Sequence, residues 1–469
     1  MSLTTCNVHF SQQSNKIVYL SSPLAKQLKL SGKKSVHLKL GNEVITAEIK
    51  QLKRPGNHLY LSTAVRQSIR VPKSGNISVL NNGDNEVQLG PLVGILSEST
   101  GRSESNPFGG RTGFIKQIIR TGEHKAYLFG FTPSDINWQQ ETINGYFLTP
   151  QGSWYRKIVP LPDVVYNRLP SRKTETSASI NSLRERFVRR KIPFFNWSFF
   201  NKADVYKLLD NDPEALEHLP ESVSGPASDK IKEMLEKHQF LYFKPTAGSL
   251  GAGIYRLTYH PKRGYFARYR KGSENVLLRF ANFQSLIRML HARHGSNLSR
   301  YVVQQGIRLI EIDSCPIDFR FHMHKNGKNE WVPAGIGAKK AGRGSVTTHV
   351  KNGGSLMTPE QALDKTFGDE AGAVLDKAKK VAVKLSEAIE RNYPHRLGEL
   401  GLDIGIDKDG EVWMFEANAK PGRSIFKHPA LRSEGRASLS YILEHCLYLS
   451  RFQSQSQSQS QSQSQGGNG

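Results

Sequence analysis

The sequence predicts an α/β chain that begins with a small β-rich domain. Two observations support this fold class. Residues 1–88 consist mainly of short apolar segments that alternate with polar residues, which is typical of strands. Residues 89–200 and 201–450 alternate strand-like and helix-like segments, as α/β folds do. A chain of 469 residues with an apolar share of 37% can form packed cores in about three such domains.

The β-rich domain is predicted over residues 1–88. Segments such as KIVYL, SVHLKL and VITAEIK are separated by Gly, Asn and Pro. SPLAKQLKL (22–30) is a candidate short helix, and NNGDN (81–85) is a candidate linker to the next domain. No group of catalytic residue types stands out here, so we expect a structural or docking role.

Residues 89–200 are predicted to form an α/β domain. PLVGIL, AYLFGFTP, DVVYNRLP and PFFNW read as strands, whereas GGRTGFIKQIIRTG and SINSLRERFVRRK have helical spacing. The glycine-rich GGRTG (109–113) could meet a ligand, although a stretch of this kind is more often a turn before a helix.

Composition narrows the classes of partner. The net charge of +24 favours acidic partners, but the basic residues are dispersed and no nucleic-acid-binding signature is present, so nucleic acid is disfavoured. Three widely spaced cysteines argue against a disulfide framework and for a reducing compartment. With no signal peptide and no membrane-spanning apolar run, we expect a cytoplasmic protein. The Gln/Ser tail, residues 451–469, is predicted to be disordered.

The domain predicted over residues 201–450 holds the chemistry-bearing segments. FLYFKPTAGSLGAGIYRL (240–257) carries Lys244 into a loop with three glycines, whose N–H groups can form an anion-binding concavity. A plain hairpin with a flexible turn is equally compatible. RYVVQQGIRLI (300–310) could offer backbone groups to an adenine edge, with Ile307 against the ring, or could simply be the end of a core strand.

A third segment, PIDFRFHMHKNGKNEWVPAGIGAKKAGRGSVTTHVKNGG (316–354), is rich in cations. Asp318 and Arg320 are two residues apart on a strand and share a face. The basic stretch that follows can bind a substrate carboxylate or stabilise charge that develops during phosphoryl transfer, unless it is a solvated loop. It carries Lys339, Lys340, Arg343, His349, Lys351 and Asn352.

The fourth segment, GLDIGIDKDGEVWMFEANAKPG (401–422), reads as a hairpin with its turn at KDG. Glu416 and Asn418 point to one face of the second strand, and Asp403 can lie opposite them. Two carboxylates and an amide oxygen are ligands that Mg²⁺ takes beside a phosphate. The plain alternative is a hairpin with surface carboxylates.

The order of these segments resembles the ATP-grasp superfamily, which includes D-alanine–D-alanine ligase and RimK-type glutamate ligases. EANAKPG is the most specific match, and the resemblance covers about residues 190–430. FNKADVYKLL, FKPTAGSLGAGIYRL and FEANAKPG make the whole chain similar to the YheC/YheD-type endospore coat-associated proteins. The resemblance implies an ATP-grasp fold, of α/β (α+β) class, after a pre-ATP-grasp α/β domain and the small β-rich N-terminal domain.

The resemblance also implies roles for the nucleotide site, with ATP and Mg²⁺ as cofactors. Lys244 would contact the phosphates, and either Lys202 or Lys207 would be the earlier ATP lysine. The loop from Thr246 to Gly253 would cover the phosphates, with Gly248, Ser249 and Gly251 in it. Gln304, Gln305 and Ile307 would form the adenine hinge, where Gln304 replaces a glutamate common in the family.

The remaining roles concern the metal and the reacting groups. Asp403, Glu416 and Asn418 would bind one or two Mg²⁺, and Arg320, Lys339, Arg343 and Asn352 would meet the acylphosphate or substrate. Dipeptide ligases often carry an arginine two residues before the first metal acid. This chain has Gly401 there, so the oxyanion role would fall to Arg320, Lys339 or Arg343.

The function implied is an ATP- and Mg²⁺-dependent carboxylate–amine ligase that acts through an acylphosphate on an amino acid or peptide. The positive chain fits an acidic substrate. The YheC/YheD resemblance links the protein to the bacterial spore coat, with spore-coat proteins as partners, and places it in the mother-cell cytoplasm or at the coat surface. The alternative is an ATP-binding coat assembly protein without ligase turnover.

Overall fold

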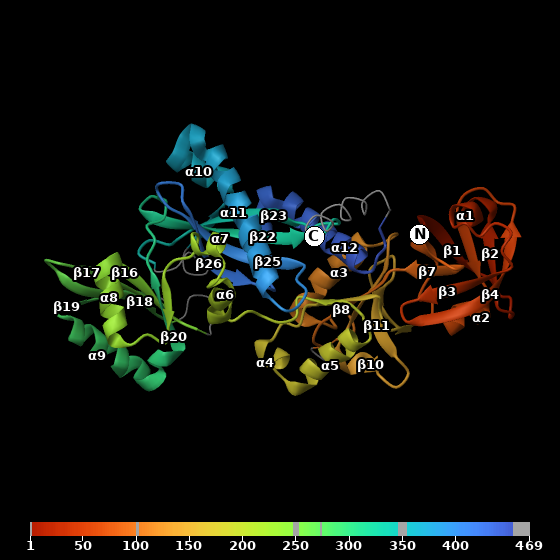
Figure 1. The fold of residues 1–469 in the computed structure, drawn as a ribbon, viewed down its shortest axis with the longest axis horizontal. Helices are drawn as coiled ribbons and strands as arrows, with labels where there is room; N and C mark the ends of the chain where they lie inside the picture. Colours follow the sequence, from red (N-terminus) through yellow and green to blue (C-terminus); the bar gives the residue numbers. More distant parts are fainter. Residues whose placement is uncertain (1, 100–102, 247–252, 273, 346–353, 454–469) are drawn as a thin grey trace, which may run out of the picture.

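The computed structural model describes residues 2–99, 103–246, 253–272, 274–345 and 354–453, apart from the side chains of residues 202, 203, 296 and 297. Four sheets follow one another along the long axis of the molecule (Figure 1). The N-terminal barrel lies at one end. The sheet built from residues 222–305 lies at the other end, and the last part of the chain returns to the middle (Figure 1).

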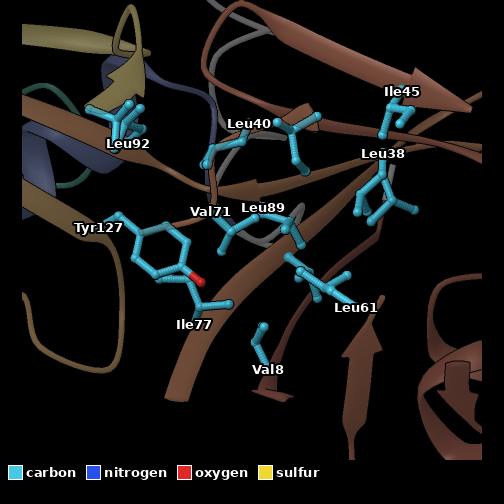
Figure 2. Packing of buried hydrophobic residues seen from close by; sticks show 14 of the residues in the cluster. Val8, Leu38, Leu40, Ile45, Leu61, Val71, Ile77, Leu89, Leu92 and Tyr127 are labelled. Carbon is cyan, nitrogen blue, oxygen red and sulfur yellow. The ribbon is translucent and has the colours of Figure 1, made fainter. Parts of the chain in front are cut away.

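The first sheet is a closed barrel with the strand order β1-β5-β2-β4-β3-β7-β6. Its strands and two short helices are β1 Ser2–Phe10, β2 Ile17–Ser21, α1 Ser22–Gln27, β3 Ser35–Leu40, β4 Glu43–Leu52, β5 His58–Leu61, α2 Thr63–Ser68, β6 Gly75–Gly83 and β7 Glu86–Gly90. The helix predicted within residues 22–30 is confirmed as α1. Figure 2 shows barrel side chains such as Val8 and Leu61 converging inside, with Tyr127 from the next sheet beside them.

The linker predicted at NNGDN (81–85) is wrong. These residues end β6 and form the turn to β7, which pairs with both β6 and β3 and so helps to close the barrel. Asp84 and Asn85 both have positive φ, of 47° and 60°, as a tight hairpin turn requires. The Asn/Gly/Asp signal was a hairpin signal, which composition alone does not distinguish from a linker.

The barrel contains an internal repeat. The order strand–strand–helix–strand of β1, β2, α1 and β3 recurs in β4, β5, α2 and β6, and YLSSPLAKQLKL (19–30) matches YLSTAVRQSIRV (60–71). Tyr19 and Tyr60, at equivalent positions, face each other across the β2–β5 pair. Lys29 and Arg70, also equivalent, both take positive φ after their helices, at 54° and 51°. The barrel is therefore two copies of one unit related by an approximate two-fold axis.

The second sheet has the order β10-β11-β9-β8-β13-β14, with β12 paired to β11. Its elements are β8 Leu92–Leu96, α3 Thr112–Thr121, β9 Tyr127–Phe131, β10 Ile136–Asn137, β11 Thr142–Leu148, β12 Trp154–Pro160, β13 Val164–Asn167, α4 Arg172–Glu175, α5 Ala178–Arg189 and β14 Phe194–Phe195. The two helices predicted in this region are confirmed as α3 and α5. Strands β9, β8, β13 and β14 run parallel, so their helices cover the sheet faces.

The third sheet has the order β15-β20-β16-β17-β18-β19. It is formed by β15 Ser222–Ser224, β16 Phe240–Pro245, β17 Tyr255–His260, β18 Gly264–Lys271, β19 Glu274–Phe280 and β20 Tyr301–Gln305, with helices α8 Ser228–His238 and α9 Phe283–His294. Helices α6 Lys202–Leu209 and α7 Pro213–Leu216 come before this sheet in the chain but pack into the core of the fourth sheet. Helices α8 and α9 supply Ile231, Leu235, Leu286 and Leu290 to its core.

The fourth sheet has the order β24-β23-β22-β25-β26, with β21 paired to β22. Its elements are β21 Glu311–Ile312, β22 Cys315–Lys325, β23 Trp331–Lys340, β24 Ser355–Met357, α10 Pro359–Phe367, α11 Ala371–Asn392, β25 Glu399–Ile406, β26 Val412–Asn418 and α12 Arg432–Leu449. Strands β25 and β26 confirm the hairpin predicted around KDG. Helix α12 contacts both α3 of the second sheet and β22 of the fourth.

The fourth sheet has one apolar and one polar face. Phe319, Phe321, Leu400 and Leu402 are fully buried and pack on the side where α11 contributes Ala378, Ala382 and Leu385. Because side chains alternate along a strand, the residues between them point to the opposite face. That face carries Asp318, Arg320, His322 and His324 of β22, Glu399, Gly401 and Asp403 of β25, and Glu416 and Asn418 of β26.

No helix in the described part of the chain is both long and apolar enough to cross a membrane. The three cysteines, Cys6, Cys315 and Cys446, are all buried and unpaired.

Candidate active site

The polar face of the fourth sheet brings together residues that are far apart in sequence. Arg320 lies opposite Asp403 in the β22–β25 pair, and Asp403 lies opposite Glu416 in the β25–β26 pair. Asn418 lies opposite Gly401. The register shifts just after Asp403, and bulges of this kind often aim side chains at functional sites. The structure thus places Asp403, Glu416 and Asn418 side by side, with Arg320 next to them.

Asp403 is held by two cations. Arg320 donates from Nε to Asp403 Oδ1 and from Nη2 to Oδ2, each over 2.7 Å, which is the two-point geometry favoured by arginine and carboxylate. Lys339 Nζ donates to Asp403 Oδ1 over 3.0 Å and lies 3.0 Å from Asp318 Oδ1. The side chains of Arg320 and Asp403 are only 14% and 15% exposed, so the ion pair is largely shielded from water.

These contacts decide the charge states. Burial alone would raise the pKa of Asp403, but the adjacent Arg320 and Lys339 hold that pKa well below its usual value. Burial would likewise lower the pKa of Arg320 and of Lys339, and the neighbouring carboxylates raise both instead. All three groups are therefore ionised at neutral pH.

The oxygens at this site fit a magnesium ion shared with phosphate. A carboxylate offers about four lone-pair positions, and hydrogen bonds from Arg320 and Lys339 use three of those on Asp403. Asn418 Nδ2 donates to Glu416 Oε1 over 3.1 Å, which leaves the amide oxygen of Asn418 for a cation. In the described ranges, no cluster of three or more His, Cys, Asp or Glu residues could hold a metal. The donor set is thus two carboxylates and an amide, which suits Mg²⁺ completed by phosphate and water.

A second group of polar residues lies on the third sheet. Lys244 of β16 is buried and donates from Nζ to Gln304 Oε1 of β20 over 2.6 Å. Gln304 Nε2 donates to Ser222 Oγ over 3.0 Å and also to Tyr206 OH. Tyr206 OH donates to the backbone oxygen of Phe415, next to Glu416, over 3.0 Å. This chain of bonds joins Lys244, the lysine predicted for the phosphates, to the strand that carries Glu416.

A family model described as YheC/D-like ATP-grasp matches residues 191–449, which is more than half of the chain. The chain belongs to this ATP-grasp family. The match confirms the predicted ATP-grasp fold, and its mixture of helices and strands fits the α+β class.

Two relatives of the YheC/D family are similar over most of their length. The endospore coat-associated protein YheD of Bacillus subtilis (strain 168) is 34% identical over 418 residues, which cover 88% of this chain and 91% of YheD. YheC of the same organism is 23% identical over 348 residues, covering 71% of this chain and 91% of YheC.

Solved structures of ligases resemble the chain more distantly. The D-alanine-D-alanine ligase from Coxiella burnetii is 11% identical with a TM-score of 0.44, covering 80% of this chain and 97% of that one. D-alanyl-alanine synthetase A from Vibrio cholerae O1 biovar eltor is 13% identical with a TM-score of 0.45, covering 77% and 98%.

The other predicted site residues of this YheC/D-like chain do not form a cluster like the one around Asp403. Thr246 bonds through Oγ1 to the backbone oxygen of Arg300 over 3.0 Å, and Gln305 Oε1 accepts from the Glu221 N–H over 3.1 Å. Ile307 follows β20 and is partly exposed, whereas Lys207 and Arg343 are exposed. Gly248, Ser249, Gly251 and Asn352 lie outside the described residues, as does the side chain of Lys202.

Sequence reasoning missed two groups at this site. Tyr206 and Ser222 complete the bonding of Gln304, yet no motif or spacing singles them out. Arg168 and Arg423 flank Glu399 at the far end of the polar face. The basic residue after Pro-Gly in EANAKPGR was the only sequence signal for this second group.

Proposed function

We propose that the chain is an ATP- and Mg²⁺-dependent ligase that joins a carboxylate to an amine through an acylphosphate. The observation that carries the proposal is the joint placement of Asp403, Glu416 and Asn418 beside the paired cations Arg320 and Lys339. Phosphoryl transfer needs alignment and charge neutralisation more than a protein nucleophile, and this site offers both.

The reaction would proceed in two steps. A substrate carboxylate oxygen attacks the γ-phosphorus of ATP, and the bond to the β–γ bridging oxygen breaks to release ADP. The amine nitrogen then attacks the acyl carbon, phosphate leaves, and the nitrogen gives up a proton to solvent as the amide forms. Asp403, Glu416 and Asn418 would hold Mg²⁺, which would offset the negative charge that develops on the phosphate oxygens. Lys244 would hold the nucleotide phosphates, and Arg320 and Lys339 would stabilise negative charge on the acylphosphate.

Gly401 supports the assignment of Arg320 to that stabilising role. A Cβ atom on Gly401 would lie 2.5 Å from Pro421 Cβ and 3.2 Å from Arg320 Nη1. The position therefore has no room for a side chain. The guanidinium of Arg320, a residue of the neighbouring strand β22, lies beside it. The positive charge would then come from β22 in place of β25.

The relatives suggest where the enzyme acts. YheD carries the description endospore coat-associated, and we propose the same setting for this chain, in the mother-cell cytoplasm or at the coat surface, with coat proteins as partners. The carboxylate and amine substrates would be amino acids or peptides.

A second candidate is an ATP-binding coat assembly protein without turnover. The observation in its favour is that three hydrogen bonds from cations already occupy Asp403. An ion pair of this geometry could close the site to a metal.

One experiment separates the two candidates. ADP and phosphate release with Mg²⁺ would be measured while amino acids and short peptides are screened, with wild type beside Glu416→Gln. Release that needs a particular carboxylate–amine pair, and that Glu416→Gln abolishes, is the result expected of a ligase. Tight Mg·ATP binding without turnover across the screen would favour the assembly protein, and no ATP binding would overturn both.

A further inference from the structure

The polar face of the fourth sheet continues past Gly401 to a second group of charges. Glu399, two residues before Gly401 on β25, is 1% exposed and pairs with Arg168, which follows β13 of the second sheet. Tyr166 OH also donates to Glu399, over 2.7 Å. Arg168 is likewise 1% exposed, so this ion pair is buried where the second and fourth sheets pack together.

Two more arginines lie at the same place. Arg423 follows the Pro-Gly of the metal-site strand and donates to Ser438 Oγ over 2.7 Å and to the backbone oxygen of Gly435 over 2.8 Å. The guanidinium groups of Arg168 and Arg423 each lie 5.0 Å from the ring centre of Phe114 on α3. Arg111 precedes Phe114 by three residues, so the two side chains lie on one side of the first turn of α3.

Of these three arginines, Arg111 is the one whose guanidinium is available to bind a ligand. Within the described residues, its guanidinium has no hydrogen bond or ion pair, and it is only partly exposed. Burial lowers the pKa of Arg111, and the like charge of Arg168 lowers it further, although Tyr166 and Glu399 partly offset this. Three guanidinium groups therefore gather around the single carboxylate Glu399, and the local charge is positive.

Such an excess of positive charge, carried by one buried and two partly exposed guanidinium groups, is stabilised when an anion binds. Planar guanidinium groups bind carboxylates through two parallel hydrogen bonds, and Arg111 has this donor pair to offer. A Cβ atom built on Gly110 or Gly113, on either side of Arg111 and Thr112, would meet nothing within 4 Å, so the neighbouring backbone also leaves space for a ligand.

The separation of Glu399 and Asp403 along β25 sets a minimum length for a ligand that reaches from Arg111 to the site around Asp403. Glu399 and Asp403 are four residues apart on one strand, which is about 13 Å at the rise of a β-strand. An extended peptide covers this distance in about four residues, whereas a single amino acid does not.

We propose that Arg111, supported by Arg168 and Arg423, binds a carboxylate of the ligase substrate, and that this substrate is an acidic peptide. The inference rests on the proposed ligase function, because it assigns one end of the substrate to Arg111 and the reacting end to the site around Asp403.

The test is binding of two peptides of equal length, tetraglutamate and tetraglutamine, to the full-length chain by calorimetry with Mg·ATP present and absent. Wild type is expected to bind tetraglutamate at least about tenfold more tightly, because charge-assisted bonds to arginine exceed neutral ones. Arg111→Gln is expected to lose this preference, and Arg111→Lys to keep part of it. Arg120→Gln, an exposed position at the other end of α3, serves as the matched control and should behave as wild type.

The outcomes separate the inference from the proposed function. Equal binding of both peptides by wild type, no binding of tetraglutamate, or an unchanged preference in Arg111→Gln would overturn the inference. A lower melting temperature of Arg111→Gln with loss of Mg·ATP binding would show a structural role and would also overturn it. If wild type prefers tetraglutamate through Arg111 but binds no Mg·ATP, the acidic-peptide site stands and the ligase proposal fails.

Discussion

The two ends of one sheet face carry opposite charge. Around Asp403, three carboxylates face the two cations Arg320 and Lys339, the other two carboxylates being Asp318 and Glu416. Around Glu399, one carboxylate faces three guanidinium groups, those of Arg111, Arg168 and Arg423. The first end is suited to a metal cation and the second to an anion, although the same strands, β22 and β25, build both. The difference arises because the second end also receives residues from the preceding α/β region.

The largest expected effect comes from the buried ion pair of Arg168 and Glu399 at the second end. Arg168→Met would leave Glu399 buried without its partner, and removal of one member of such a pair costs about 3–5 kcal/mol. Urea unfolding measures this loss. Arg189→Met, which removes an exposed ion pair with Glu185, is the control and should change the unfolding free energy by about 0.5 kcal/mol or less. Equal losses in both variants would show that Glu399 is solvated and that the two ends do not differ as described.

The next effect tests the role proposed for Arg320 beside Asp403. Arg320→Lys keeps the charge but cannot form both bonds to Asp403, so kcat should fall by about 100-fold or more once a substrate pair is known, with little change in KM for ATP. Steady-state kinetics beside the exposed Arg288→Lys on α9 provide the test. A rise in KM for ATP without a fall in kcat would move Arg320 from charge stabilisation to nucleotide binding.

Acid should destabilise the protein through two buried histidines, His324 and His445. Burial lowers the pKa of His324 to about 4 and that of His445 to about 3, far below the unfolded value near 6.5. The unfolded state then binds more protons, so their contribution is complete above about pH 6.5 and is lost as pH falls below it. Each of the two histidines should lower the free energy of unfolding by about 1–2 kcal/mol as the pH falls from 7 to 5.

Chemical denaturation of wild type, His324→Gln and His445→Gln at several pH values in this range measures how steeply the free energy of unfolding changes with pH. The exposed His291→Gln should keep the wild-type slope. Because the adjacent cations hold the pKa of Asp403 below its usual value, that carboxylate keeps its stabilising ion pairs until the pH falls below about 4. A wild-type stability that is constant from pH 7 to 5 would contradict burial of neutral histidines.

The smallest expected effect concerns the link between the third and fourth sheets. Tyr206→Phe removes the hydroxyl that accepts from Gln304 and donates to Phe415, and should cost about 1–2 kcal/mol of unfolding free energy. Binding of Mg·ATP should weaken too, because Gln304 helps to hold Lys244. If Tyr206→Phe is less stable but binds Mg·ATP as tightly as wild type, the hydroxyl contributes to stability and not to nucleotide binding.

Local patterns predicted much of this molecule. The hairpin that carries Asp403, Glu416 and Asn418 was predicted because a short turn between alternating strands brings the three to one face. Helices α3 and α5 were predicted from spacing. The barrel repeat was also present in the sequence, as YLSSPLAKQLKL and YLSTAVRQSIRV, and a search for internal similarity would have found it.

What the sequence by itself determined is therefore the elements named above, the hairpin that carries Asp403, Glu416 and Asn418, and the family. The elements and the hairpin depend on residues close together along the chain, and the family was indicated by the order of its motifs. Only the tertiary structure decided which cations meet these carboxylates. Arg320 reaches Asp403 across 83 residues, and Arg168 reaches Glu399 across 231. No local periodicity encodes such distant pairs; they form only where β22, β25 and the preceding α/β region pack together, and there they establish the opposite charges of the two ends.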